Sequence, residues 1–238
     1  MEPLQLVLKL GLSFLANLGL GLAGFYAHAF ERSGLIAGLV LGTLITYAFG
    51  PGGFLIVLAF VGFGSLATRA RLEHKVALGI SPPGGTARDW RNALANLSVP
   101  ALGALLHSFR PQPILAIFTT AAIATSTFDV VATEIGKGFS STCVTLRDLK
   151  TREAGAPGGI SAVGTAAGAV AGLGVALVAN GFQLVGAAMV PFIVVSALLA
   201  SASESLLKSA VGVRSSHAAN ITNALLGGLI AALFAQNF

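Results

Sequence analysis

Two carboxylates stand in an otherwise apolar stretch, "IATSTFDVVATEIGKGF", at residues 123–139. Asp129 and Glu134 would each cost at least ~2.5–3.5 kcal/mol at the depth of a bilayer, so other groups must neutralise them. Mg²⁺ binds one or two carboxylates together with phosphate oxygens, which predicts a metal and phosphate site. An ion pair with Lys137 or a neighbouring arginine is the alternative. On a regular helix the two acids are offset by about 140°, so they face one site only if the helix loosens at the two following glycines.

A second polar group opens the apolar segment that begins near residue 90, in "RDWRNALAN" at 88–96. Arg88 and Arg91 would start a helix, and guanidinium groups bind phosphate with two parallel hydrogen bonds. Asn92 and Asn96 follow on one face of that helix. A positively charged anchor at a membrane surface explains the arginines equally well, but it does not explain Asn96, a turn deeper.

A glycine-rich turn precedes another apolar segment, in "GAPGGISAVGT" at 155–165. Gly158 and Gly159 allow close approach to the backbone, and Ser161 stands where a helix would begin, which together favour an anion-binding cradle. The chain contains no G-x-x-x-x-G-K-[ST] motif, so this turn is not a P-loop. Small residues every four positions indicate close helix packing beyond the turn. These residues are Gly164, Gly168 and Gly172.

The last apolar segments carry a fourth set of polar residues. Glu204 and Lys208 are spaced for an ion pair one helical turn apart. Asn220 and Asn223 share a face of the final segment, where amides either lock helices together or bind a ligand.

The composition defines a membrane protein. Hydrophobic residues make up 55% of the 238 residues and charged residues 10%, whereas a water-soluble domain has roughly a quarter of its residues charged. The net charge of +5 is small and scattered, which argues against a nucleic-acid partner. The single cysteine, Cys143, excludes an internal disulfide and a multi-cysteine metal site. "GLGLAG" at 19–24 fits a dinucleotide motif, but it lies within an apolar span with no preceding strand.

Windows of about 20 apolar residues predict an all-α bundle of about eight transmembrane helices in a single domain, 1–238. The first apolar run is too long for the core of a signal peptide, so we expect it to be a retained span. The sequence "FGPGG" at 49–53 must turn between two short spans. The predicted spans are 4–29, 34–50, 52–68, 92–108, 113–135, 160–180, 182–203 and 218–236.

The basic residues test this count. All lysines and arginines except Lys9 and Arg110 lie in, or next to, the loops that follow the first, third, fifth and seventh predicted spans. The positive-inside rule then places those loops in the cytoplasm and both termini outside. The candidate residues gather toward the same side, so we expect a site that faces the cytoplasm. The membrane is either a plasma or a thylakoid membrane.

Four blocks together resemble the integral membrane family known as domain of unknown function 92, the family of transmembrane protein 19 and the plant phytyl phosphate kinase. The similar region covers about residues 34–230. The third block is the most specific, because the family pattern there is close to A-D-T-x-A-S-E-[IL]-G, and Asp129, Glu134 and Gly136 fall in register. The blocks are "GSLATRARLEHKVALGI" (64–80), "RDWRNALANLSVPAL" (88–102), "FDVVATEIGKG" (128–138) and "GAPGGISAVGT" (155–165).

The resemblance implies a nucleoside-triphosphate-dependent kinase that converts a phytyl-like isoprenoid monophosphate into its diphosphate with Mg²⁺, in tocopherol biosynthesis or a related route. CTP is the expected donor. Phosphoryl transfer depends chiefly on positioning and on charge neutralisation. Asp129, Glu134 and Glu204 would then hold the metal, and Asp129, Glu134 and Lys137 would be catalytic. The expected nucleotide and phosphate ligands are Arg69, Lys75, Arg88, Arg91, Asn92, Asn96, Gly158, Gly159, Ser161, Asn220 and Asn223.

Two other functions stay open. A transporter or channel for small anions also uses glycine-interrupted spans and polar residues within the membrane. A cytidylyltransferase that forms a CDP-lipid would use the same substrates, and it differs from a kinase only in its products.

Overall fold

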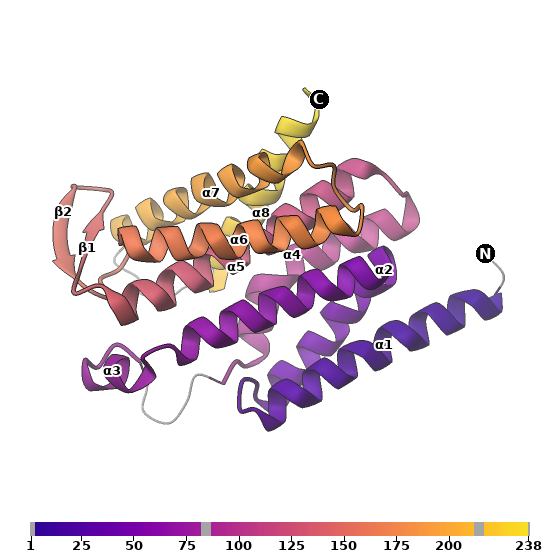
Figure 1. Ribbon diagram of the computed structural model, residues 1–238, viewed down its shortest axis with the longest axis horizontal. Coiled ribbons are helices and arrows are strands. Elements are labelled where there is room, and N and C mark those ends of the chain that lie inside the picture. The colour runs from indigo at the N-terminus through magenta and orange to yellow at the C-terminus, as the bar shows by residue number, and fades with distance from the viewer. Residues whose placement is uncertain (1–2, 82–86, 212–216, 238) are drawn as a thin grey trace.

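The computed structural model describes residues 3–81, 87–211 and 217–237. The chain forms a bundle of long helices with one short helix and a three-stranded sheet at one end (Figure 1). The helices are α1 (Pro3–Tyr26), α2 (Arg32–Arg69), α3 (Leu72–Ala77), α4 (Trp90–Phe109), α5 (Pro113–Phe139), α6 (Ala162–Gly181), α7 (Met189–Val211) and α8 (His217–Ala235).

Helix α2 is two antiparallel helices joined by a sharp turn. Gly50 adopts φ 62° and ψ −145°, a conformation open only to glycine, and Pro51 then starts the second half with its φ already set. The two halves fold back on each other, because Gly34 and Gly64 both lie against Arg88. The turn predicted from "FGPGG" and the two spans on either side of it are therefore confirmed.

Eight long helical rods result when the two halves of α2 are counted separately and the six-residue α3 is left out. Within the described residues, six helices are long and apolar enough to cross a bilayer: α1, α2, α5, α6, α7 and α8. Each half of α2 is long enough for one crossing, and α4 packs among the others against α2, α5 and α8. The predicted all-α membrane bundle of about eight helices is confirmed.

The structure brings the connections expected on one side of the membrane to one end of the bundle. Phe30, after α1, pairs with Arg88, before α4. Arg147, after α5, donates to the carbonyl of Ala210 at the end of α7. We call this the basic end, and it carries α3 and the sheet, while both chain termini lie away from it (Figure 1). Arg214, counted among the basic residues of this side, lies outside the described residues.

One local prediction is wrong. The span predicted at 182–203 is helix α7 at Met189–Val211. Residues 182–188 form a turn in which Leu184 donates to the carbonyl of Ala179 and Asn180 donates to that of Val185. An unbroken apolar run hid this turn. The shift places Glu204 inside the last turns of α7 rather than beyond the helix.

The three-stranded sheet was not predicted. Its strands are β1 (Thr142–Thr145), β2 (Lys150–Glu153) and β3 (Gly159–Ile160), in the order β2-β1-β3 with antiparallel pairing. Strands this short give no usable alternation of apolar and polar residues. In the turn between β1 and β2, the Thr145 hydroxyl donates to the Asp148 carboxylate, and this hydrogen bond lowers the pKa of Asp148 to about 2. The sheet covers the ends of α5, α6 and α7.

Helix α5 lies at the centre of the bundle and packs against α2, α4, α6, α7 and α8. The glycines of α6 that recur every four residues make its contact with α5 close, as predicted from their spacing. A Cβ added at Gly168 would lie 2.8 Å from the Phe128 carbonyl oxygen and 2.9 Å from the Ala132 Cβ. A Cβ at Gly164 would lie 2.4 Å from the Ala132 carbonyl oxygen. These glycines set the distance between the two helices.

Replacing Gly168 with alanine should therefore destabilise the bundle by about 1–3 kcal/mol, because the added methyl group forces α5 and α6 apart. Thermal unfolding of the purified protein in detergent, followed by circular dichroism, measures the effect. Gly181→Ala is the matched control, since a Cβ there meets no atom within 4 Å. An unfolding midpoint for Gly168→Ala equal to that of Gly181→Ala would contradict this account of the packing.

Candidate active site

A pocket of about 150 Å³ opens at the basic end between α5, α6, α7 and the glycine-rich turn. Asp129 and Thr133 line it from α5, one helical turn apart, as their shared face predicts. Lys137, from the last turn of α5, and Lys208, from α7, are its cations. Phe128 and Leu198 close its apolar part.

Glu204 does not line this pocket itself but lies directly beside Lys208, which does. Its side chain is 3% exposed, and its carboxylate forms an ion pair of 2.7 Å with the Lys208 ammonium. The Asp129 carboxyl lies within hydrogen-bonding reach of Glu204 and interacts electrostatically with Lys208. The predicted pair one turn apart is confirmed, and it places two carboxylates and a lysine together. Sequence reasoning treated Lys208 only as a partner of Glu204, although its spacing placed it on the same face.

The glycine-rich turn forms the outer wall of the pocket. Gly158 and Gly159 both line it, and Gly158 has φ 66° and lies so close to α7 that a Cβ would meet the Ser205 carbonyl oxygen at 2.2 Å. The Gly159 amide donates to the Ala156 carbonyl, and Ser161 accepts from the Gly164 amide as the N-cap of α6. The predicted cradle residues therefore lie at the pocket, where they also hold the turn and the helix start in place.

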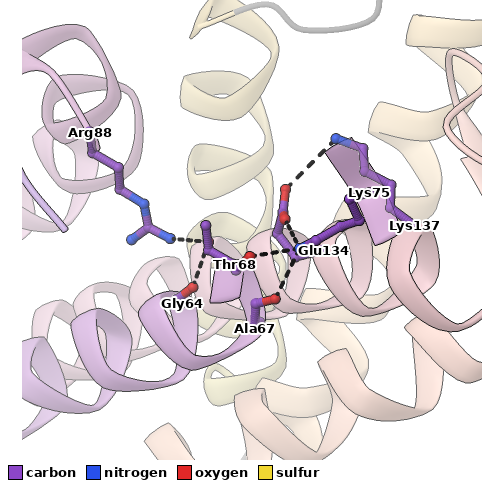
Figure 2. Close-up of polar contacts among 7 residues, drawn as sticks. All are labelled: Gly64, Ala67, Thr68, Lys75, Arg88, Glu134 and Lys137. Carbon is purple, nitrogen blue, oxygen red and sulfur yellow. Dashed lines mark hydrogen bonds and ion pairs between the residues drawn. The ribbon is translucent and has the colours of Figure 1, made fainter. Parts of the chain in front are cut away.

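Glu134 faces away from this pocket. Helix α5 stays continuous to Phe139, so the loosening that would bring Glu134 beside Asp129 does not occur. Its carboxylate instead forms a 2.6 Å ion pair with Lys75 of α3 and lies 3.7 Å from the Lys137 ammonium (Figure 2). The predicted alternative, an ion pair with Lys137, is confirmed, but Lys75 is the closer partner.

Lys75 is fully buried. Its ammonium donates to the carbonyls of Thr68 and Ala67, at 2.7 and 3.3 Å, as well as to Glu134 (Figure 2). These contacts use all three of its protons, so the ammonium caps the end of α2 and fixes α3 against α5. Lys137 connects the two groups, because it lies beside Glu134 and also lines the pocket.

Five other predicted ligands lie around the start of α4 and the end of α2, and none of them lines the Asp129 pocket. Arg69 donates to the Ala27 carbonyl, and Arg91 is exposed over the Trp90 ring. Asn92 donates to Asp89, whose pKa is lowered, chiefly by the backbone amide of Asn92. Asn96 donates to the Asn92 carbonyl. The fifth residue, Arg88, lies beside the Thr68 hydroxyl.

The two asparagines of α8 lie on the far side of α7. Asn223 is buried, and its amide nitrogen is 3.4 Å from the hydroxyl of Ser201, which lines the pocket. Asn220 is half-buried, one turn earlier. Asn223 therefore contacts the pocket wall rather than its interior.

The donor set fits a magnesium ion with one or two carboxylate ligands. Asp129 lines the pocket and Glu204 lies beside it, and Mg²⁺ takes its remaining ligands from waters and phosphates. Among the described residues no cluster of three or more His, Cys, Asp or Glu side chains exists, so an all-protein metal cage is absent from this part of the chain. Lys137 and Lys208 place two positive charges in the same pocket.

Fold and pocket together define a multi-pass helical membrane protein with a pocket of paired acids and lysines at one end of its bundle. Residues 15–234 match the family described as "Integral membrane protein DUF92", so the chain belongs to that family, as its sequence blocks predicted.

Three curated relatives are similar to the chain. An uncharacterized membrane protein of Synechocystis, sll0875, is 33% identical over 171 residues, which covers 71% of this chain and 66% of the relative. Protein VTE6, chloroplastic, of Arabidopsis thaliana is 26% identical over 217 residues, 87% of this chain and 65% of the relative. The uncharacterized membrane protein MJ0933 of Methanocaldococcus jannaschii is 28% identical over 167 residues, 70% of this chain and 68% of the relative. The chain thus spans about two thirds of the length of these relatives, and no solved structure matches it.

Removing one partner of the buried ion pair should destabilise the protein. Lys75→Met leaves Glu134 without its closest counter-charge, which costs about 3–5 kcal/mol at buried sites. Adding Glu134→Gln should recover a large part of this loss, because the unpaired charge is gone. Unfolding midpoints of the two variants and the wild type measure the effect. A double variant that is less stable than Lys75→Met would contradict a direct pair.

Cys143 reports on the pocket because its thiol lies in the pocket wall and is 6% exposed. Burial raises the pKa of this thiol above its usual range, so less thiolate is present at neutral pH. Maleimide labelling should therefore be slow at pH 7 and keep rising above pH ~8.5, where an ordinary thiol levels off. A labelling rate that levels off at or below that pH would contradict the buried position.

Proposed function

We propose that the protein transfers a phosphoryl group from a nucleoside triphosphate to the phosphate of an isoprenoid lipid at the Asp129 pocket. The observation that carries this proposal is the meeting of Asp129 and Glu204 with Lys208 and Lys137 around one pocket. Acids for Mg²⁺ and lysines for phosphates are the groups that phosphoryl transfer requires. The family resemblance and the similarity to the chloroplast protein VTE6 support an isoprenoid phosphate as acceptor.

The shape of the pocket suits an amphiphilic acceptor. Its polar end holds the lysines, and its apolar end, at Phe128 and Leu198, lies between α5 and α7. Leu198 is 42% exposed on a spanning helix, so a chain leaving this end passes directly into lipid. The phosphate of the acceptor would then lie at the basic end, which the distribution of lysine and arginine assigns to the cytoplasm.

The residues of the pocket have distinct tasks in this reaction. Asp129 and Glu204 would hold Mg²⁺, which neutralises the donor phosphates when bound. Lys137 and Lys208 bind phosphate oxygens and orient donor and acceptor. An oxygen of the lipid phosphate forms a bond to the terminal phosphorus of the donor while the bond from that phosphorus to the nucleoside diphosphate breaks. The acceptor is already an anion, so no general base is needed, and CTP is the expected donor.

The proposal gives Glu134 a supporting task in place of the metal-binding one expected from the sequence. Its carboxylate holds Lys75 and limits where the Lys137 ammonium can lie. A cytidylyltransferase would use the same pocket, with attack at the innermost phosphorus and release of pyrophosphate. A small-anion transporter would need polar residues along its whole path, whereas the ion pairs among the described residues all lie at the basic end.

A kinase assay in detergent tests the proposal. Geranylgeranyl or phytyl phosphate is offered with Mg²⁺ and each terminally labelled nucleoside triphosphate. We expect label in a prenyl diphosphate, and a rate lowered about 10²–10³-fold in Asp129→Asn and in Glu204→Gln, since each removes a charge that neutralises the reacting phosphates. Asp148→Asn, on the exposed hairpin, is the control. CDP-lipid with pyrophosphate would identify a cytidylyltransferase, and no product with any pair would refute both enzymes.

Two further readouts separate the roles. Glu134→Gln should lower the rate without changing the Mg²⁺ concentration that gives half-maximal activity. Replacing a residue that binds the metal would instead raise that concentration. Binding of the donor with Mg²⁺ should slow the labelling of Cys143, and Asp129→Asn should lose this protection.

A further inference from the structure

Arg88 is a half-buried cation with one fully buried guanidinium nitrogen, and it lacks a counter-charge in the described part of the chain. Its Nη1 atom is buried without a hydrogen-bond partner, and its Nη2 atom is 3.4 Å from the Thr68 hydroxyl. The guanidinium carbon lies 5.8 Å from the centre of the Phe60 ring. Burial lowers the pKa of Arg88, and only the distant charge of Glu134 opposes this shift. Leaving a buried guanidinium unpaired is costly.

Glu134 does not serve as that counter-charge. Its carboxylate is paired with Lys75 at 2.6 Å and with Lys137 at 3.7 Å, and Arg88 approaches Thr68 from the opposite side (Figure 2). No carboxylate forms an ion pair with Arg88 among the residues that the structure describes.

The position of Arg88 is built by its surroundings. Its amide donates to the Ala29 carbonyl at 2.9 Å, and its carbonyl accepts from the Glu31 amide at 3.0 Å. A Cβ added at Gly64 would lie 2.7 Å from the Arg88 Nη2 atom, so the guanidinium lies directly against the backbone of α2 and a larger residue at this position would displace it. These backbone contacts therefore hold the Arg88 side chain between α2 and α4, with its guanidinium toward the interior of the bundle.

An apolar pocket adjoins the guanidinium. It lies between α1, both halves of α2, and α4, has a volume of about 40 Å³, and contains Arg88 and Asp89 at its polar end. The Asp89 carboxylate accepts hydrogen bonds from the amide and side chain of Asn92, so it caps the start of α4 and forms no ion pair with Arg88 among the described residues. The apolar walls include Leu20, Leu35, Leu39, Val57, Phe60 and Leu97.

We propose that this pocket binds an anionic phospholipid of the surrounding bilayer, with its phosphate at Arg88 and a segment of one acyl chain between α1, α2 and α4, while the rest of the chain stays in the bilayer. A phosphate supplies the missing negative charge and accepts two parallel hydrogen bonds from a guanidinium. A free anion would leave the apolar walls unfilled, whereas an acyl chain fills them. Helix α1 packs mainly against α2, so a chain can enter from the bilayer beside it.

This site is separate from the Asp129 pocket. Arg88 contacts Thr68, on the side of that residue away from Glu134 (Figure 2), and neither Arg88 nor Glu134 lines the Asp129 pocket. The bound lipid would neutralise Arg88 and fasten α1 to α2 and α4, and it takes no part in the proposed transfer. Its test therefore measures stability, and its result is independent of kinase activity.

Thermal unfolding of the delipidated full chain in detergent tests the site. Added phosphatidylglycerol should raise the unfolding midpoint by roughly 5–10 °C when it is about a hundredfold above its dissociation constant. Phosphatidylcholine, which is zwitterionic, and inorganic phosphate, which lacks a chain, should each raise it far less. Equal stabilisation by phosphatidylcholine, or by inorganic phosphate, would overturn the proposal.

Three variants locate the effect. Arg88→Met should lose the response to phosphatidylglycerol and, without lipid, match or exceed the wild-type midpoint, because an unpaired buried charge is gone. Gly38→Leu fills the pocket away from Arg88, at a position where a Cβ meets no atom within 4 Å, and should also lose the response. Arg91→Met removes an exposed arginine three residues from Arg88 and should keep it.

Several outcomes would refute the site. A response that persists in Gly38→Leu would show that no chain occupies the pocket, even if Arg88→Met failed to fold. Loss of the response to phosphatidylglycerol in Arg91→Met would show that exposed positive charge, rather than the pocket at Arg88, binds the lipid. Stabilisation by an isoprenoid phosphate but not by phosphatidylglycerol would give the pocket to the acceptor instead.

Discussion

The close contact of α5 with α6 and α7 determines where the charged groups of α5 can lie. Gly164 and Gly168 bring the α6 backbone against the carbonyls of Ala132 and Phe128, so no bulky side chain separates the helices beside Asp129. In a bilayer the hydrophobic effect does not hold helices together, and small residues that permit close packing take its place. The opposite face of α5 is thereby left to Glu134, which must find its counter-charge on α3. One helix then carries two separate polar clusters.

The two clusters satisfy the same physical demand in different ways. Glu134 is balanced internally by Lys75, whose remaining protons go to the end of α2, so that cluster is complete without a ligand. Among the described residues, Asp129 and Glu204 both interact with Lys208, beside an open pocket that Lys137 also lines. A cation together with anionic phosphates would complete the second cluster. This difference favours the Asp129 pocket as the place where chemistry occurs.

The sequence predicted the parts of this arrangement that depend on composition and spacing. Apolar windows gave the eight rods, the Gly50–Pro51 pair gave the turn within α2, and the four-residue glycine spacing gave the α5–α6 contact. Helical geometry gave the 140° offset of the two acids, and the structure keeps that offset because α5 stays regular. The spacing of residues along one helix does not show which residues of other helices will contact each of its faces. Lys75 lies far from Glu134 in the chain, and nothing in its local sequence marks it as buried.

The same limit explains why the predicted phosphate ligands divide into two groups. Arginines and asparagines near a membrane surface look alike in sequence, whether they face water, a neighbouring helix or a pocket. Only the fold distinguishes Arg91, stacked on Trp90 and exposed, from Arg88, three residues earlier, whose Nη1 atom is buried without a hydrogen-bond partner. A cation that the surrounding backbone holds inward, beside apolar walls, needs an anion that carries an apolar chain. The bilayer supplies such molecules in abundance, which is why the lipid itself is the natural counter-charge of Arg88.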